Sequence, residues 1–489
     1  MLLSDLIMIN SDAGVKFEIS GDYSNINIDG ISSDSRMCQK NFLFAALPGG
    51  NADGRKFIES AIAKGAVAVL APMGTEFTGD ALFIKTDEVR RALGFISAKF
   101  YSKQPENIIA VTGTNGKTSV AHFCRHIWSK LGKKSASIGT IGVIDEKEKL
   151  LPGSEGLTTP DPVRLHGFLS DLCNKGVTHL AMEASSHGLE QSRLAGVKIK
   201  AAGITNITRD HLDYHGTFED YFTAKMRLFN DVLPKGGTAV LNADIKEFSD
   251  IFAICRTRSD NVITYGEKGG DIKLIQAKPS SSGIDIEIEV EGTIYKIKTA
   301  LIGSFQSSNL LCAIGLVMAA GNEISEITEA CDGIKAVTGR MEKVAEKNGA
   351  PIIVDYAHTP DALEKVLMAL RPHTKANLVV VFGCGGDRDK GKRPIMGEIA
   401  DRLADLVVVT DDNPRTENAE TIRREIMSGC KNCEEIGDRA RAIEYAIKNL
   451  KKGDLLVIAG KGHEDYQIIG DKKSHFSDAE EARKVVKLL

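Results

Sequence analysis

Residues 108–118 read Ile-Ile-Ala-Val-Thr-Gly-Thr-Asn-Gly-Lys-Thr, an apolar stretch that breaks into a glycine-rich turn. Residues 120–131 follow with apolar side chains at the spacing of one helix face. A strand, a glycine loop and a helix in this order form a phosphate-binding loop, in which backbone N–H groups and the helix N-terminus face the anion. The loop is shorter than the usual G-x-x-x-x-G-K-S/T pattern, and the motif alone would be weak evidence. The flanking strand and helix strengthen the interpretation. The sequence predicts an ATP site here, with Lys117 as a cation and the Thr118 hydroxyl as a group that can hold Mg²⁺.

Length and charge limit the classes of protein to which the chain can belong. Its 489 residues exceed what one hydrophobic core usually serves, so we expect two to four domains. Its 62 Lys and Arg against 66 Asp and Glu give a net charge of −4, which argues against nucleic-acid and membrane-surface partners. The start lacks a basic region and a cleavage site, and no apolar run is long enough to cross a bilayer. We therefore expect a cytoplasmic protein with free thiols.

The pair Cys430 and Cys433 has C-x-x-C spacing, which is also found at metal and redox sites. No second pair and no cluster of other ligands stands near it in the sequence. We interpret these residues as incidental thiols near a helix end.

The last third of the chain repeats one pattern. Four apolar runs are each followed at once by a polar motif: 352–354 by 355–358, 378–382 by 383–388, 406–409 by 411–415, and 455–459 by 460–464. Helical segments separate the runs, which predicts parallel strands joined by right-handed crossovers. Ligands of open α/β sheets bind beyond the carboxyl ends of the strands, so the four motifs predict one binding cleft.

The middle region also carries polar groups next to apolar runs. Glu183 ends the run 179–182, where a nucleotide-binding fold places an acid that holds Mg²⁺. Segment 206–215 follows another apolar run and contains His211, Asp213 and His215. This density of polar groups at the end of a strand predicts a site. Lys225 lies in a helical stretch, and its pattern alone indicates a surface lysine. Residues 284–290 alternate apolar and polar side chains and continue beyond Glu291-Gly292 as a predicted hairpin.

Taken together, these motifs resemble those of a known family. The set comprises residues 112–118, 182–188, 208–216, 339–340, 355–358 and 412–415. It resembles the Mur ligases, and within them the members that add meso-diaminopimelate to UDP-N-acetylmuramoyl-L-alanyl-D-glutamate for peptidoglycan synthesis. The match runs through all regions of the chain in the expected order, which makes it far more specific than the phosphate loop alone.

The resemblance implies an α/β fold with three domains. A smaller N-terminal α/β domain over residues 1–104 would bind the UDP end of the substrate. A central P-loop-type domain with a mostly parallel sheet, over residues 105–335, would bind ATP. A Rossmann-like α/β domain over residues 336–489 would bind the incoming amino acid. We expect small-molecule substrates and a monomer.

The resemblance also implies the residues of each site. The UDP-muramoyl dipeptide would be held by Ser33, Ser35, Gly50, Asn51, Ala52, Thr158, Thr159, Ser185, Gln191 and Arg193. ATP would be held by Gly113, Thr114, Asn115, Gly116, Lys117, Thr118, Ser119, Asn309, Arg340 and Asp355. The family usually has Asn where this chain has Gln306, so either Gln306 or Asn309 is the residue that contacts adenine.

Catalysis would depend on Lys117, Glu183, His211 and Lys225. The implied Mg²⁺ ligands are Thr118, Glu183, His211 and Lys225, with Lys225 carbamylated. A carbamate makes chemical sense because it offers anionic oxygens to a hard cation, whereas an ammonium group repels the metal. His211 would act as a metal ligand or charge stabiliser and not as a base.

The motifs of the last third would select the amino acid. The meso-diaminopimelate site would comprise Arg388, Asp412, Asn413, Pro414, Arg415, Gly460 and Glu464. Diaminopimelate carries a carboxylate at its far end that lysine lacks, and the planar fork of Arg415 suits a carboxylate. A buried Arg beside the lysine ammonium would cost on the order of several kcal/mol, so Arg415 argues against lysine.

The expected reaction is an ATP-dependent ligation. The γ-carboxylate of D-glutamate would attack the γ-phosphate of ATP, and the amine of the amino acid would then attack the acyl phosphate. Two enzyme alternatives share this machinery, a lysine-adding ligase and a folylpolyglutamate-type ligase. A third alternative is a protein that hydrolyses ATP without joining two substrates, which the intact motifs disfavour.

Overall fold

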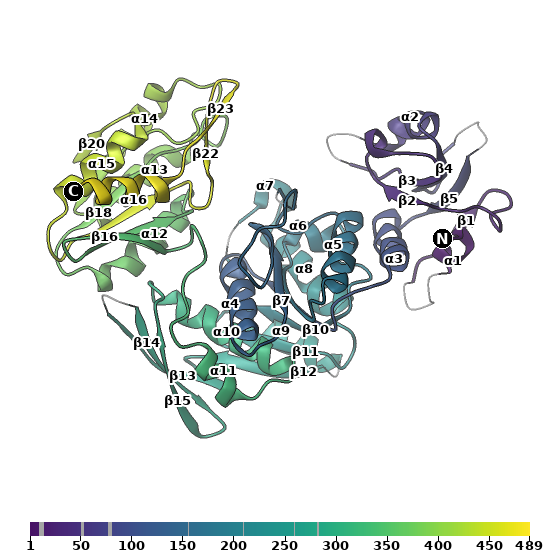
Figure 1. Ribbon diagram of the computed structural model, residues 1–489, viewed down its shortest axis with the longest axis horizontal. Coiled ribbons are helices and arrows are strands. Elements are labelled where there is room, and N and C mark those ends of the chain that lie inside the picture. The colour runs from purple at the N-terminus through teal and green to yellow at the C-terminus, as the bar shows by residue number, and fades with distance from the viewer. Residues whose placement is uncertain are drawn as a thin grey trace. The chain divides into compact units, whose positions relative to one another are not determined.

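The computed structural model describes residues 1–8, 14–49, 53–76, 81–154, 156–208, 210–258, 260–280 and 283–489. The chain divides into two compact units, residues 1–270 with 312–323 and residues 271–311 with 324–489 (Figure 1). None of the helices in these ranges is both long enough and apolar enough to cross a membrane.

The N-terminal part of the first unit is a five-stranded sheet in the order β1-β5-β4-β3-β2. Its strands are β1 (Glu18–Ile19), β2 (Gly30–Ser32), β3 (Phe42–Ala45), β4 (Ala66–Pro72) and β5 (Leu82–Thr86). Its helices are α1 (Leu3–Ile7), η2 (Ser35–Met37), η3 (Gly54–Phe57), α2 (Ile58–Ala63) and α3 (Val89–Tyr101). Successive side chains of β3 point to opposite faces. Leu43 packs on the face covered by α1 and α3, and Phe44 packs on the face covered by α2.

The central part of the first unit is a sheet in the order β12-β11-β10-β6-β9-β7-β8, parallel except for β8. The strands are β6 (Asn107–Thr112), β7 (Ser135–Gly139), β8 (Gly142–Ile144), β9 (His179–Glu183), β10 (Ile199–Ile204), β11 (Thr238–Asn242) and β12 (Asn261–Gly266). The connecting helices are α4 (Lys117–Lys130), α5 (Pro162–Asn174), α6 (Ser186–Glu190), α7 (Leu212–His215), α8 (Phe218–Arg227), η4 (Leu228–Val232) and α9 (Phe248–Thr257).

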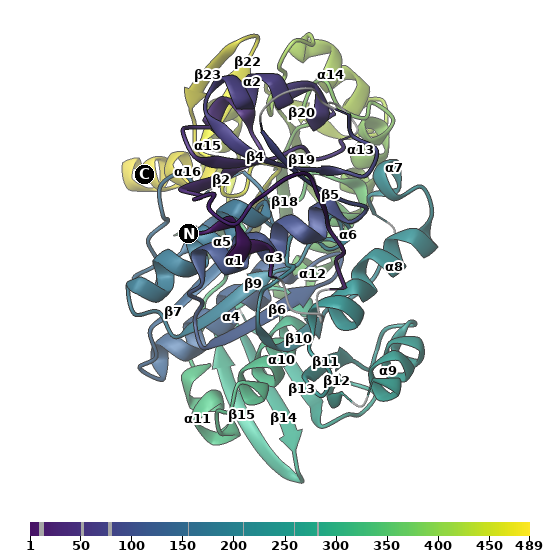
Figure 2. The ribbon, with the colours of Figure 1, turned by 90° about the vertical axis from the view of Figure 1, so that its right-hand side faces the viewer.

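Helices cover both faces of the central sheet, as its apolar strands require. Apolar residues of α5, α8 and α9 pack against one face, and Figure 2 shows α9 beside β11 and β12. On the other face α4 packs against β6, β7 and β9, and the end of α10 (Phe305–Ala319) brings Leu316 to Gly203 of β10.

The second unit begins with an antiparallel meander of β13 (Ile272–Pro279), β14 (Ile284–Val290) and β15 (Thr293–Thr299). The predicted hairpin is confirmed, because Val290 pairs with Thr293 across the turn Glu291-Gly292. Both turn residues have positive φ, +50° and +78°, as a two-residue hairpin turn requires. Helix α11 (Ile324–Ala330) follows.

A six-stranded sheet in the order β16-β17-β21-β18-β19-β20 forms the rest of this unit. Its strands are β16 (Glu342–Lys347), β17 (Ala350–Asp355), β18 (Leu378–Phe382), β19 (Leu406–Val409), β20 (Cys433–Glu435) and β21 (Leu455–Ala459). The helices that connect these strands are α12 (Pro360–Leu370), η5 (Arg371–His373), α13 (Lys392–Leu403), α14 (Ala419–Met427) and α15 (Arg439–Asn449). A small hairpin of β22 (Tyr466–Ile469) and β23 (Lys472–His475) and the helix α16 (Asp478–Leu488) follow the last strand.

The prediction for the last third is confirmed. The four apolar runs are β17, β18, β19 and β21, which are parallel to one another and adjacent in the sheet. Their polar motifs therefore begin at one edge of the sheet. Helices α12, α13 and α14 cover one face and α15 and α16 cover the other, so the predicted α/β fold class is confirmed as well. The predicted domain boundaries after residues 104 and 335 stay a prediction.

The nine cysteines are free thiols, as expected. Cys433 begins β20 and packs against the hydrophobic core of this sheet, and its Sγ lies 3.7 Å from the Cys430 carbonyl oxygen. Within the described ranges, no group of three or more His, Cys, Asp and Glu side chains is arranged to hold a metal ion.

A fully buried ion pair stabilises the C-terminal sheet. The guanidinium of Arg439, at the start of α15, donates two hydrogen bonds of 2.7 Å to the Asp478 carboxylate at the start of α16. The same guanidinium donates to the backbone carbonyls of Ala459 and Asp411, at 3.0 and 3.3 Å. Arg439 thus connects both helices to the ends of β21 and β19.

We expect Asp478→Ala to lower stability strongly, because it leaves the Arg439 charge buried without its carboxylate partner. Loss of one partner of a buried pair costs about 3–5 kcal/mol. Differential scanning calorimetry should show a clear decrease of the unfolding temperature. Glu444→Ala, which removes the exposed pair of Glu444 with Lys448, is the matched control and should have little effect. Equal effects of the two variants would contradict this account.

Candidate functional site

The predicted phosphate loop lies between β6 and α4, at the carboxyl edge of the central sheet. Gly116 has φ +89° and precedes the first residue of α4, Lys117. Gly113 has φ +148°, and a Cβ there would collide with Oγ1 of Thr205. Both conformations favour glycine. The strand, loop and helix predicted from the sequence are therefore confirmed.

The segment after β10 holds this loop in place. The Thr114 and Asn115 amides donate to the carbonyl and side-chain oxygens of Asn206, at 2.8 and 3.0 Å. Thr205 Oγ1 donates to the Asn115 carbonyl at 2.6 Å. The start of segment 206–215 is thus hydrogen-bonded to the phosphate loop, whereas Arg209 and the side chain of Asp213 lie outside the described residues.

Two lysine side chains meet at one oxygen of the loop. Lys117 Nζ donates to the Gly113 carbonyl at 2.8 Å and to the Thr114 carbonyl at 2.9 Å. Lys225 Nζ donates to the same Gly113 oxygen at 2.9 Å and lies 4.4 Å from the centre of the Tyr221 ring. Burial, and next the positive charge of Lys117, hold the pKa of Lys225 well below its usual value.

The interpretation of Lys225 as a surface lysine is wrong, because this side chain is 1% exposed. It lies on the buried face of α8, one turn after Tyr221 and one turn before Phe229. The spacing of these apolar residues was the available signal, since positions four apart share a helix face. The positive charge outweighed that spacing in the sequence-based interpretation.

Glu183 ends β9 as predicted and is almost fully buried. Its carboxylate accepts hydrogen bonds from the amide and the hydroxyl of Thr140, at 2.9 and 3.2 Å. A Cβ at Gly139 would overlap this carboxylate, so the glycine makes room for it. Thr140 is not among the predicted site residues, although it directly follows the strand β7 at the same sheet edge.

The residues assigned to the muramoyl dipeptide form one hydrogen-bonded network in the first unit. Thr140 Oγ1 lies 3.0 Å from Thr158 Oγ1, and Thr159 Oγ1 lies 3.0 Å from Ser185 Oγ. Arg193 donates to the Thr159 carbonyl at 2.7 Å and to the Gln191 side-chain oxygen at 2.8 Å. The structure thus brings this predicted group together.

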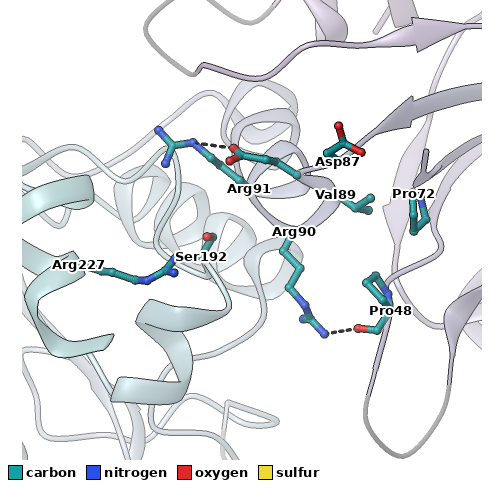
Figure 3. Close-up of a pocket in the computed structure, with 9 residues that line it drawn as sticks. Pro48, Pro72, Asp87, Val89, Arg90, Arg91, Ser192 and Arg227 are labelled. Atoms are coloured by element: carbon teal, nitrogen blue, oxygen red, sulfur yellow. Dashed lines mark hydrogen bonds and ion pairs between the residues drawn. The ribbon is translucent and has the colours of Figure 1, made fainter. Parts of the chain in front are cut away.

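A groove beside this network connects it to the N-terminal sheet (Figure 3). It is lined by Pro48, Pro72, Asp87, Glu88, Val89, Arg90, Arg91, Ser192 and Arg227. Arg90 donates to the Pro48 carbonyl at 2.6 Å and to the Gln191 side-chain oxygen at 3.5 Å. Arg90 is not among the predicted site residues, because nothing in the local pattern of α3 indicates a partner 101 residues away.

Of the residues assigned to the UDP end, Ser33 is half-buried and Ser35 is buried at the start of η2. Asp34 lies between them, and its carboxylate caps η2 by accepting from the Arg36 amide at 2.9 Å. Gly50, Asn51 and Ala52 lie outside the described residues.

His211 has φ +51° and precedes α7, with its side chain about half exposed. Its ring centre lies 5.0 Å from that of His187, which stacks on Tyr214 at 4.0 Å. His215 is buried, and burial lowers its pKa. The predicted juxtaposition of the histidines therefore exists and includes His187 of α6 as a further member.

In the second unit, two of the residues assigned to ATP, Arg340 and Asp355, lie close together at the end of β17. Asp355 accepts hydrogen bonds from the Met341 and Ala357 amides, at 2.7 and 2.8 Å. The Arg340 guanidinium lies 4.5 Å from the centre of the Tyr356 ring. In α10, Asn309 and Gln306 are both buried and joined by a hydrogen bond of 3.0 Å, so their alternative assignments to adenine remain open.

The motifs after β18 and β19 bring two arginines together. A Cβ at Gly385 would lie 2.8 Å from Nη1 of Arg415 and 3.9 Å from Cγ of Arg388. Arg415 has φ +51°, and its Nη1 donates to the Gly386 carbonyl at 2.8 Å. The Gly386 amide donates to the Asn413 carbonyl at 2.9 Å, which joins the two motifs.

Acidic side chains of the motifs after β19 and β21 lie at the same sheet edge. A Cβ at Gly460 would lie 2.7 Å from Oδ2 of Asp412. Asn413 Nδ2 donates to the Glu464 carboxylate at 3.2 Å, and Pro414 lies between Asn413 and Arg415. Burial, and next the charge of Asp412, raise the pKa of Glu464. Two cations and two carboxylates thus share this rim.

We expect Gly113→Ala to weaken nucleotide binding by at least about tenfold, because it forces Thr205 away from the loop and strains the backbone by about 1–3 kcal/mol. Calorimetric titration with ADP measures the effect. Gly132→Ala is the matched control, since Gly132 also has positive φ, +71°, but has no atom within 4 Å of its Cβ position. An equal loss of affinity in the control would show that crowding of the loop is not the cause.

Comparison with known proteins agrees with this geometry. Three family profiles match the chain: "Mur ligase family, catalytic domain" over residues 27–101, "Mur ligase middle domain" over 111–317, and "Mur ligase, glutamate ligase domain" over 339–462.

Two relatives are the UDP-N-acetylmuramoyl-L-alanyl-D-glutamate–2,6-diaminopimelate ligases of Caulobacter vibrioides and Bradyrhizobium diazoefficiens. The first is 48% identical over 93% of this chain and 94% of its own, and the second is 46% identical over 98% of each. A solved structure of a protein with the same name aligns with a TM-score of 0.71 and 34% identity, over 96% of this chain and 97% of its own. The chain therefore belongs to the Mur ligase family and is an ATP-dependent amide ligase.

Proposed function

We propose that this enzyme adds meso-diaminopimelate to the D-glutamate residue of UDP-N-acetylmuramoyl-L-alanyl-D-glutamate, a step of peptidoglycan precursor synthesis. The observation that carries the proposal is the rim of the C-terminal sheet, where Arg388 and Arg415 flank Gly385 while Asp412 and Glu464 lie in the adjoining motifs. Diaminopimelate has two carboxylates and two ammonium groups, which matches these charges in kind. The relatives named above, which the chain matches over nearly its whole length, support the same substrate.

The charged groups of this rim recognise different parts of the amino acid. Arginine offers a planar fork of N–H donors to a carboxylate, so Arg388 and Arg415 suit the carboxylates of the ligand. Asp412 and Glu464 suit its ammonium groups, while the Asn413 amide, the Pro414 turn and the Gly460 backbone shape the pocket. Lysine carries an ammonium where diaminopimelate has its far amino-acid centre, and that charge would face an arginine.

The chemistry needs activation of a carboxylate that is a poor electrophile. The D-glutamate γ-carboxylate attacks the γ-phosphorus of ATP, which forms an acyl phosphate and releases ADP. The diaminopimelate amine then attacks the acyl carbon, and phosphate leaves as the amide forms. The loop amides and Lys117 stabilise the charge that develops during phosphoryl transfer. Positioning of the substrates supplies the remaining catalysis, and no protein nucleophile is required.

The remaining residues fit these roles by position. The loop Gly113-Thr114-Asn115-Gly116-Lys117-Thr118-Ser119 would bind the phosphates of ATP, with Arg340, Asp355 and Gln306 or Asn309 completing that site. The network of Thr158, Thr159, Ser185, Gln191 and Arg193 would hold the dipeptide, and Ser33, Ser35 and Gly50-Asn51-Ala52 the UDP end. The profile matches over 27–101, 111–317 and 339–462 fall within the predicted domains 1–104, 105–335 and 336–489, which supports those boundaries. We also propose that the enzyme is a monomer and acts in the cytoplasm.

The residues assigned to Mg²⁺ fit the ion only if Lys225 is modified. Glu183 and Thr118 offer oxygen donors, and His211 offers an imidazole nitrogen. An ammonium on Lys225 would instead repel the cation, and Lys117 lies close enough to add to that repulsion. A carbamate on Lys225 would supply anionic oxygens at the loop. Mg²⁺ bound there would neutralise charge on the phosphates and the attacking carboxylate.

We expect wild-type enzyme to form an amide product with meso-diaminopimelate and very little with lysine. Arg415→Met should raise the KM for diaminopimelate about tenfold or more, because a charge-assisted hydrogen bond is worth about 1.5–3 kcal/mol. Mass spectrometry of the product, with UDP-muramoyl dipeptide, ATP and a panel of amino acids, tests both statements. Equal coupling of lysine would contradict the proposed substrate, and steady ATP hydrolysis without any amide product would contradict ligation.

We expect a carbamate on Lys225 in active enzyme. Its burial and the nearby Lys117 charge favour the neutral amine, which is the form that adds carbon dioxide. With ¹³C-bicarbonate, the NMR spectrum should show a carbamate carbonyl that is missing in Lys225→Arg. Depletion of carbon dioxide should lower turnover, and bicarbonate should restore it. An unchanged rate after depletion, together with no carbamate signal, would exclude the modification.

A further inference from the structure

Lys461 is a buried lysine that the reaction described above does not use. It follows Gly460 at the end of β21, and its side chain is 0% exposed. Its Nζ donates to the side-chain oxygen of Asn413 at 3.0 Å and to the Tyr466 carbonyl at 2.8 Å, and it lies 3.6 Å from the Asp412 carboxylate. A buried charge of this kind is costly unless it is paired and hydrogen-bonded, so its position calls for a physical reason.

Lys461 decides how the side-chain amide of Asn413 is oriented. The Asn413 oxygen accepts from two groups that can only donate, Lys461 Nζ and the Ile468 amide, each at 3.0 Å. Rotation of this amide would place its NH₂ group against both donors. The NH₂ group must therefore lie on the opposite side, where it donates to the Glu464 carboxylate at 3.2 Å.

Strand β22 and the residue that follows it make further hydrogen bonds to the motif after β19. Gln467 Nε2 donates to the Asp412 carbonyl at 2.8 Å, the Arg415 amide donates to the Ile468 carbonyl at 3.2 Å, and the Gly470 amide donates to the Arg415 carbonyl at 2.8 Å. The Lys461 side chain joins two segments, because it contacts Asn413 in the motif after β19 and Tyr466 in the strand β22.

We propose that Lys461 is a positioning residue for the diamino acid: it holds Asn413 and β22 so that Glu464 and Asp412 face the ammonium groups of the ligand. The inference rests on the proposed function, because Glu464 and Asp412 are the groups assigned there to those ammonium groups. It assigns Lys461 no contact with the ligand and no part in phosphoryl transfer. Loss of Lys461 should therefore affect binding of the amino acid selectively.

The test is the variant Lys461→Met, which keeps most of the length of the side chain and removes the charge. With ATP and UDP-muramoyl dipeptide at saturation, the KM for meso-diaminopimelate should rise about ten- to a hundredfold, the effect of losing a hydrogen bond to a charged group. The KM for ATP and kcat at saturating diaminopimelate should change little. Lys472→Met, at an exposed lysine of β23, is the matched control and should behave as wild type.

A second readout separates positioning from a general structural role. Lys461, the Asn413 hydrogen bond and Arg415 lower the pKa of Glu464, which burial and Asp412 raise. Without the Lys461 charge this pKa rises further, and Glu464 must be ionised to bind an ammonium group. The loss of affinity at acidic pH should therefore begin at a higher pH in Lys461→Met. The other ionisable groups that act with Glu464 are Arg439, Tyr356 and Tyr466.

Asn413→Asp covers the outcome in which Lys461→Met does not fold. The new carboxylate keeps the contacts with Lys461 and Ile468 but turns an oxygen toward Glu464 in place of the NH₂ donor. A higher KM for diaminopimelate in a folded Asn413→Asp enzyme supports the inference. An unchanged KM in this variant, or in folded Lys461→Met, overturns it, as does a decrease of kcat with every KM unchanged. Failure of wild-type enzyme to couple diaminopimelate would instead overturn the proposed function.

Discussion

The carbonyl oxygen of Gly113 joins the nucleotide loop to helix α8, a distant part of the first unit. It accepts hydrogen bonds from Lys117, four residues along the chain, and from Lys225, 112 residues along the chain. Two amino groups on one oxygen can both be charged only at high cost in a buried setting. An anionic ligand at the loop, or conversion of one amine to an anionic group, would relieve this repulsion. The loop therefore has an electrostatic preference for negative charge that its own glycines and amides do not provide alone.

Buried cations also lie at the carboxyl edge of the C-terminal sheet. Arg439 and Lys461 are fully buried cations behind the loops that follow β19 and β21. Their donors end on backbone carbonyls and on the side chains of Asp478 and Asn413, so the loops are held by charge-assisted hydrogen bonds. Groups at the rim then need little reorganisation when a charged ligand binds, which is the advantage of a preorganised site.

Much of this fold could be predicted from local sequence patterns. The phosphate loop, the end of β9 at Glu183 and the four parallel strands of the last sheet each depend on residues that are close in sequence. The burial of Lys225 was not predicted, although Tyr221 and Phe229 share its helix face, because a charged side chain in an amphipathic helix usually lies on the exposed face. Thr140, Arg90 and Lys461 were missed for a different reason: their partners lie 43, 101 and 48 residues away in the chain. Only the tertiary contacts give these side chains their roles.

Glycines at the sheet edge determine how closely the charged groups can approach one another. A side chain at Gly385 would meet the Arg415 guanidinium, and one at Gly460 would meet the Asp412 carboxylate. Because Gly385 and Gly460 have no side chain, cations and anions of neighbouring motifs lie side by side without a bulky residue between them. Under the proposed function, a ligand with an amino-acid centre at each end can satisfy both kinds of charge. A ligand that lacks the second carboxylate leaves an arginine without an anionic partner. Because an unpaired charge costs more than a missing contact, the arginines select the ligand mainly by penalising the wrong one.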